Sequence, residues 1–203
     1  MEEGRSMGTR RCILEVAQRL FAAYGYHGAS IRHIVQACGV SNAALYYHFG
    51  SKQDLYFEVL GEYISAVVGQ LQKADTGEGT CRSRLARVAL AYARIILESP
   101  NVLQTLLRDV AHLDRADIAR LIPSLSSQIP AAIGTILEDG ITAGEVRPVP
   151  TQRTGILMSG MVNAMAVWRL YNEIETTLEQ DVDLLIDVLF GGIAVNLDPA
   201  EAA

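Results

Sequence analysis

The chain has 203 residues, half of them apolar, so it is long enough to bury a sizeable core and is not expected to be disordered outside its ends. Its net charge of −6 argues against strong nonspecific binding to a polyanion, and no apolar run approaches the ~20 residues that a membrane helix needs. No secretory leader is apparent and the three cysteines lack metal-site spacing, so we expect a cytoplasmic protein without a cofactor or metal.

The first helix is expected to begin at Thr9, which suits an N-cap, after a flexible tail of residues 1–8. Apolar residues then recur along one stripe, which predicts an amphipathic helix that ends within the stretch 24–28. Arg10 and Arg11 fall in its first turn, where positive charge opposes the helix dipole. They are either solvated or close to a phosphate group.

A second helix is predicted to start at Ser30, another N-cap residue, and to end at Gly39. Gly39 lies where a chain that leaves a helix commonly needs a positive φ, which glycine adopts at little cost. Ser41 then caps a third helix, in which Leu45 and Phe49 are four residues apart and are expected to face inward. Two short helices joined by a glycine turn are typical of a helix-turn-helix motif.

Ser51 and Asp54 have the spacing of a capping box at the start of a longer helix, with Lys52 in its first turn. A cation beside the free N–H groups of a helix N-terminus is a favourable phosphate site, and solvent exposure is the alternative. The charge distribution agrees, since residues 9–60 carry five basic and three acidic side chains whereas residues 61–203 carry eleven and eighteen. The mildly basic part would be the one that faces DNA.

Beyond residue 80 the pattern predicts helix after helix, with no alternation typical of strands. We expect Pro123 to end a short helix and Pro130 to kink the next, because each proline removes a backbone donor. The last two helices are expected over 151–171 and about 179–196. The predicted fold class is all-α, with a three-helix head and a larger helical body, about nine helices in all.

Residues 9–60 resemble the DNA-binding head of the TetR family of bacterial transcription regulators. The motifs that carry the resemblance are, in chain order, Thr9-Arg10, Gly25, Ser30-Ile31-Arg32-x-Ile34, Gly39-Val40-Ser41, Leu45-Tyr46-Tyr47-His48-Phe49 and Ser51-Lys52-x-x-Leu55. One stretch departs from the family pattern, since Asn42-Ala43-Ala44 stands where Lys-Gly-Thr is common.

The resemblance implies a helix-turn-helix domain over 9–56 and a ligand-binding and dimerisation domain over 57–203. It also implies a homodimer formed through the last two helices, a palindromic operator in double-stranded DNA and a small-molecule effector, without membrane association. The residues expected to contact DNA are Thr9, Arg10, Ser30, Arg32, Ser41, Asn42, Ala43, Ala44, Tyr46, Tyr47, His48 and Lys52. Asn42 could bond an adenine edge, although a solvated helix start is the alternative.

Helical spacing in the body suggests residues that could surround an apolar effector, and ordinary core packing is the alternative. These residues are Tyr92, Arg108, His112, Met161, Asn163 and Trp168. Glycines in the last two helices, among them Gly155, Gly160 and Gly191-Gly192, suggest close helix packing, either between two subunits or within one.

The sequence thus favours a ligand-responsive homodimeric regulator, most simply a repressor that a small apolar ligand releases from its operator. One alternative is a helical protein-interaction bundle with a degenerate helix-turn-helix, which the alanines at 43 and 44 keep open. A helical enzyme is a further alternative. The chain shows no catalytic triad order, metal-ligand spacing or phosphate-binding glycine loop that would support it.

Overall fold

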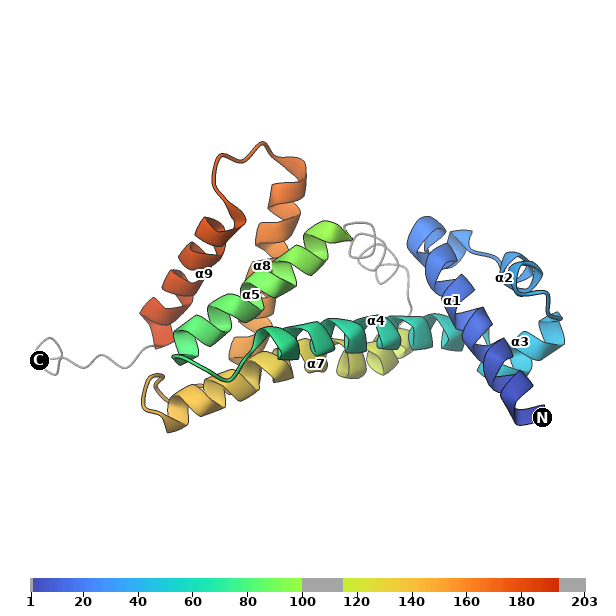
Figure 1. Cartoon of the computed structure of the whole chain (residues 1–203), viewed down its shortest axis with the longest axis horizontal. Helices are drawn as coiled ribbons and strands as arrows, with labels where there is room; N and C mark the ends of the chain where they lie inside the picture. Colours follow the sequence, from blue (N-terminus) through green and yellow to red (C-terminus); the bar gives the residue numbers. More distant parts are fainter. Residues whose placement is uncertain (1, 100–114, 194–203) are drawn as a thin grey trace, which may run out of the picture. The chain divides into compact units, whose positions relative to one another are not determined.

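The computed structural model describes residues 2–99 and 115–193, with side chains placed for residues 7–99 and 127–193. The helices are α1 (Glu2–Gly28), α2 (Ile31–Cys38), α3 (Asn42–Phe49), α4 (Lys52–Ala74), α5 (Cys81–Glu98), α7 (Arg115–Thr142), α8 (Thr151–Tyr171) and α9 (Leu178–Ile193). These described residues contain no β-strand, so the all-α prediction is confirmed (Figure 1).

The chain divides into two compact units, which we call the head and the body. Among the described residues, the head comprises 2–64, 99 and 115–124, and the body comprises 65–98 and 125–193. The first division between these compact units falls inside α4, after Ile64. The functional domains predicted over 9–56 and 57–203 stay a prediction.

The head is built on one apolar core shared by α1, α2, α3 and the start of α4 (Figure 1). Its buried side chains are Ile13, Leu14, Val16, Ala17, Phe21, Ile34, Val35, Leu45, Phe49, Leu55, Tyr56, Val59 and Leu60. They recur at helical spacing on each element, so burying them fixes three short segments that would be marginal as isolated helices.

The first helix begins earlier than its sequence predicted. α1 starts at Glu2, so residues 2–8 are helical where a tail was expected, and Thr9 does not cap the helix. An N-cap residue favours a helix start without preventing helix on its N-terminal side, and no proline precedes Thr9. The predicted end within 24–28 is confirmed, since α1 ends at Gly28 and Gly25, with a φ of 71° and a ψ of 176°, breaks the helical path.

In the body, α5 packs against both α8 and α9, which also pack against each other (Figure 1). α7 approaches α8 closely at Gly155, where a Cβ atom would lie 2.4 Å from the backbone oxygen of Pro130. Gly155 therefore serves packing within one subunit. Gly160, Gly191 and Gly192 have no such neighbour and are exposed.

The prolines of α7 do not divide it. α7 continues from Arg115 to Thr142 through the positions of Pro123 and Pro130, so the predicted helix end near Ile122 was wrong. A proline inside a helix costs about 3 kcal/mol. Burial of the flanking Ile129, Ile133, Ile136 and Leu137 offsets that cost.

The cysteines are free thiols that serve packing. Cys81 is buried and its Sγ donates to the backbone oxygen of Ile136 at 3.4 Å. Burial raises the pKa of the Cys81 thiol to about 11. Burial, followed by hydrogen bonding to Cys12, raises the pKa of the Cys38 thiol to about 12. Neither Cys38 nor Cys81 is therefore a nucleophilic thiolate near neutral pH.

Candidate nucleic-acid interface

The turn between α2 and α3 has the geometry that its residues predicted. Ser30 Oγ accepts the backbone N–H of His33 at 3.2 Å and so caps α2. Gly39 follows with a φ of 65° and a ψ of 31°, and its N–H donates to the oxygen of Gln36. Ser41 Oγ then accepts the N–H of Ala44 at 3.2 Å and starts α3. The two helices therefore meet at a fixed angle.

α3 presents one face to the core and the other to solvent. Leu45 is fully buried and Phe49 nearly so, as expected. Asn42 and Ala43 are exposed at the start of the helix, whereas Ala44 is half-buried. The outer face can thus approach a DNA groove closely at its N-terminal end.

Both tyrosines of α3 also point outward. Tyr47 is 83% exposed and Tyr46 is 47% exposed, so neither packs inside the head. His48 is half-buried, with its ring 5.2 Å from that of Tyr47 and at 75° to it. Hydroxyl and imidazole groups at these positions can donate to phosphate oxygens.

The N-terminus of α4 carries Lys52 next to the Ser51 cap, where Asp54 accepts the Ser51 hydroxyl and not its backbone N–H, so the predicted capping box is only half formed. Ser51 Oγ accepts the N–H of Asp54 at 3.0 Å and donates to its carboxylate at 2.7 Å. The Lys52 ammonium lies 4.6 Å from the centroid of the Tyr26 ring. Phosphate affinity at this point has two physical sources, the lysine cation and the N–H groups of the helix start.

Arg10 is engaged within the head, and its predicted DNA contact stays a prediction. Its guanidinium forms an ion pair with Glu58 of α4 and lies 5.3 Å from the centroid of the Phe49 ring. It therefore joins α1, α3 and α4, which sequence reasoning missed because the partners are distant in the chain. Thr9 is half-buried.

The other predicted DNA-contacting side chains lie at the surface of α2 and α3. Arg32 is exposed on α2. Ser30 and Ser41 already use their hydroxyl oxygens as acceptors in the two caps, although each hydroxyl hydrogen can still be donated.

Among the four predicted effector residues that the structure describes, Tyr92 and Asn163 are brought together. The hydroxyl of Tyr92 donates to Asn163 Oδ1 at 3.0 Å, which joins α5 to α8. Met161 is half-buried on α8, and Trp168 is 55% exposed on the same helix. Arg108 and His112 lie outside the described residues.

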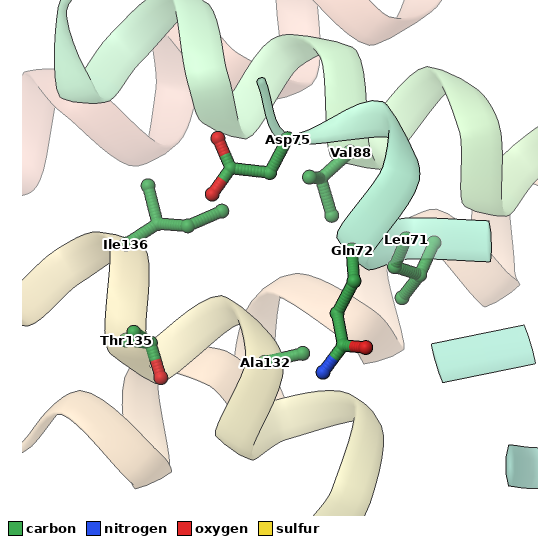
Figure 2. Close-up of a pocket in the computed structure, with 7 residues that line it drawn as sticks. All are labelled: Leu71, Gln72, Asp75, Val88, Ala132, Thr135 and Ile136. Atoms are coloured by element: carbon green, nitrogen blue, oxygen red, sulfur yellow. The ribbon is translucent and has the colours of Figure 1, made fainter. Parts of the chain in front are cut away.

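The body contains a cavity of about 140 Å³ between the end of α4, α5 and α7 (Figure 2). Its lining residues are Leu71, Gln72, Asp75, Val88, Ala132, Thr135 and Ile136. Figure 2 shows the Gln72 amide beside Ala132, with the Asp75 carboxylate toward Ile136. None of the predicted effector residues that the structure describes, Tyr92, Met161, Asn163 and Trp168, lines this cavity.

The exposed apolar side chains of the body concentrate on two helices. Among the described body residues, every exposed large hydrophobic side chain belongs to α8 or α9: Ile156, Leu157, Trp168, Tyr171, Leu184 and Val188. Gly160 and Ala164 are exposed along the line from Leu157 to Tyr171 at helical spacing, and Gly191 continues the line of Leu184 and Val188. We call this surface the α8–α9 face.

None of the helices that the structure describes combines the length and the apolar composition that crossing a bilayer requires. Within the same part of the chain, no three His, Cys, Asp or Glu side chains gather as metal ligands would.

Both units of the chain match family models. "Bacterial regulatory proteins, tetR family" matches residues 13–59, and "Tetracyclin repressor-like, C-terminal domain" matches residues 78–171.

Similar proteins include transcription repressors. The chain is 24% identical to the repressor KstR2 of Rhodococcus jostii over 140 residues, which are 69% of each chain. It is 43% identical to the repressor AcnR of Corynebacterium glutamicum over 54 residues, 27% of this chain and 29% of AcnR. The crystal structure of the TetR family transcriptional regulator PfmR from Thermus thermophilus is similar at 28% identity, with a TM-score of 0.61 over 89% of this chain and 97% of PfmR.

Proposed function

Because the chain belongs to the TetR family of bacterial transcriptional regulators, we propose that it is a homodimeric repressor whose operator is released when a small molecule binds the body. As a family member it is a DNA-binding regulator and not an enzyme. The observation that carries the proposal is the capped α2–turn–α3 unit, with Leu45 and Phe49 anchored in the core and the other face of α3 exposed. Repression is the activity named for KstR2 and AcnR. A regulator of this kind acts in the cytoplasm.

We assign the DNA contacts by position on the head. Asn42, at the start of α3, reads a base edge, and the alanines at 43 and 44 permit close approach or touch a thymine methyl group. Tyr46, Tyr47 and His48 contact the backbone, and Lys52 binds a phosphate at the start of α4. Few long polar groups are available for base reading, so part of the selectivity comes from DNA shape.

Ser30 and Arg32 are assigned a second phosphate on the α2 side, and Ser41 and Thr9 flank the contact surface. Arg10 stays in this set at the α1 side, since its ion pair with Glu58 leaves the side chain 43% exposed.

The α8–α9 face supports the homodimer. The exposed large apolar side chains that the structure describes in the body all lie on these two packed helices, and large exposed apolar patches mark interaction sites. Gly160, Ala164 and Gly191 on the same face allow the backbones of two helices to approach closely. A two-fold dimer places two heads on a palindrome whose half-sites are about 34–36 Å apart.

The effector binds the body and shifts the population between two conformations of the dimer. A ligand changes DNA affinity only if it prefers the conformation whose head spacing does not fit the operator. The cavity of Figure 2 offers apolar walls from Leu71, Val88 and Ile136, with Gln72 and Thr135 as polar partners. Its volume of about 140 Å³ accommodates only a small apolar molecule or one part of a larger one. A ligand that binds the folded body raises Tm, and the rise grows with the ratio of the ligand concentration to Kd.

A second candidate is a protein-interaction bundle whose helix-turn-helix no longer binds DNA. Ala43 at the start of α3 favours it, since an exposed methyl group offers no hydrogen bond to a base edge. This alternative predicts no DNA binding even at low salt.

The test is an electrophoretic shift with DNA from upstream of the chain's own gene, over a series of salt concentrations. We expect Lys52→Ala to weaken binding to operator and random duplexes alike and to lower the salt slope by about one. Asn42→Ala is expected to reduce the preference for the operator by about tenfold, with little effect on random DNA.

Lys73→Ala is the matched control, since Lys73 is an exposed lysine in the last turn of α4 and belongs to the body. Its binding should equal that of the unmodified protein. Absence of any shift at low salt would favour the interaction bundle, and equal binding by Lys52→Ala would remove the phosphate role of Lys52.

A further inference from the structure

Lys52 is held by an aromatic cluster in the core of the head. It is half-buried, and its ammonium nitrogen lies 4.6 Å from the centroid of the Tyr26 ring. The Tyr26 ring lies 5.0 Å from that of Tyr56, which is buried and meets Phe21 edge-on at 4.9 Å. The cation thus rests on a ring whose own position is set by the core.

Gly25 determines where the Tyr26 ring points. Its φ of 71° and ψ of 176° break the path of α1 directly before Tyr26, and glycine adopts this geometry at little cost. Tyr24, before the break, is 62% exposed, whereas Tyr26, after the break, is half-buried against Tyr56. The local backbone therefore turns one tyrosine out and the next one toward Lys52.

The ring also offsets an unfavourable charge. The N-terminal end of a helix carries a partial positive charge, so the Lys52 ammonium is poorly placed there without a compensating group. The face of an aromatic ring is electronegative and attracts a cation within about 6 Å of its centroid. Tyr26 supplies that face, and a contact with a ring face uses none of the N–H donors of the ammonium.

We infer that Tyr26 is a positioning residue for DNA binding, which holds the Lys52 ammonium at the start of α4, ready for a backbone phosphate. This inference rests on the proposed function. A lysine that is free in solution loses rotamer freedom when it binds a phosphate, whereas a lysine already held over a ring loses less. The smaller loss of entropy appears as tighter binding to any DNA sequence, because a phosphate contact carries no sequence information.

The test is a double-mutant cycle on DNA affinity, measured by fluorescence anisotropy with a random-sequence duplex and with DNA from upstream of the chain's own gene. We expect Tyr26→Leu to weaken binding to both duplexes by about threefold to tenfold. Tyr26→Phe keeps the ring face and should bind as the unmodified protein does. In the Lys52→Gln background, Tyr26→Leu should cause no further loss, since the cation that it positions is gone.

A second readout needs no DNA. The ε-methylene protons of Lys52 should resonate upfield in the unmodified protein and in Tyr26→Phe, because they lie over the ring, and at an ordinary position in Tyr26→Leu. Thermal melting checks that each variant is folded, and Tyr26→Met, which has a more flexible apolar side chain, replaces the leucine variant if that one is not.

The possible results distinguish a failure of the positioning role of Tyr26 from a failure of the proposed function. If Lys52→Gln weakens binding and Tyr26→Leu does not, the positioning role is overturned and the DNA contact of Lys52 stands. If the losses from the two substitutions multiply, Tyr26 acts independently of Lys52 and the inference is again overturned. If the unmodified protein binds neither duplex, the proposed function fails, and the inference fails with it.

Discussion

Arg10 shows how one side chain can connect three helices of a small head. It pairs with Glu58 of α4 and covers the ring of Phe49, the last residue of α3. We expect Arg10→Ala to lower the free energy of unfolding by about 1 kcal/mol, the sum of a partly exposed ion pair and a cation–π contact. Chemical denaturation monitored by circular dichroism measures this loss.

Arg11→Ala provides the control, since the Arg11 side chain is 82% exposed and pairs with Glu15, one helical turn away. That substitution should change stability by a few tenths of a kcal/mol at most. Glu58→Gln should lose only the ion-pair part of the Arg10→Ala effect, and adding it to Arg10→Ala should cause little further loss. Equal effects at Arg10 and Arg11 would contradict the bridging role.

At the level of single residues, the sequence predicted what depends on near neighbours. The caps at Ser30 and Ser41 and the turn at Gly39 involve residues within a few positions of each other, so their pattern was readable. The contacts of Arg10 with Glu58 and of Tyr26 with Lys52 join positions far apart in the chain. These pairs form because α1 packs against α4, so no local sequence pattern predicts them.

At the scale of elements, the turn between α4 and α5 is tied to α7 by charge. Arg84 of α5 donates to Asp75 through Nε and Nη2, both at 2.8 Å, and to Asp139 of α7 at 2.9 Å. The hydrogen bonds from Arg84 lower the pKa of Asp75, against the opposing effect of burial. The same hydrogen bonds raise the pKa of Arg84.

This pair predicts a loss of stability in acid. The pKa of Asp75 in the folded protein is below its unfolded value of about 3.9, so its contribution is complete above that pH and is lost as pH falls through the folded pKa. The free energy of unfolding should therefore differ between the unmodified protein and Asp75→Asn by a constant amount near neutral pH. That difference should shrink below about pH 4.

Asp183→Asn, at an exposed position of α9, is the control for the loss of one negative charge. Urea unfolding across the acid range measures all three proteins. A difference for Asp75→Asn that stays constant to the lowest pH would contradict the stabilising role of the pair.

Helix boundaries were predictable where sequence signals and packing agree. α8 spans Thr151–Tyr171, as its pattern predicted, because loops bound it on both sides. α7 did not follow its sequence signal, because its apolar face is buried and packing outweighs the cost of a proline. Local helix propensity does not predict tertiary contacts of this kind.

For the whole molecule, the α8–α9 face determines whether two heads can act together. The resemblance implied a dimer through these helices, and glycine positions alone could not separate packing within a subunit from packing between subunits. The structure assigns Gly155 to packing within the subunit, through its close approach to Pro130. The exposed Gly160, Gly191 and Gly192 remain available to a partner.

The decisive prediction at this scale concerns Leu157 of α8 and Leu184 of α9, which are 66% and 64% exposed. Replacing both by Asp places charges in the apolar face of each subunit, and a two-fold interface repeats every charge. We expect a monomer by light scattering, with helical content unchanged, because neither side chain belongs to the core. Operator affinity should fall by several orders of magnitude, since one head then binds without its partner.

Ala131→Asp is the matched control, because Ala131 is an exposed apolar residue of the body that lies on α7, outside the α8–α9 face. This variant should remain a dimer and bind the operator normally. If the Leu157→Asp/Leu184→Asp variant is still dimeric, another surface forms the dimer. If it is monomeric but binds operator DNA as tightly as before, the spacing of the two heads does not determine DNA affinity. An effector could then not release the operator by changing that spacing.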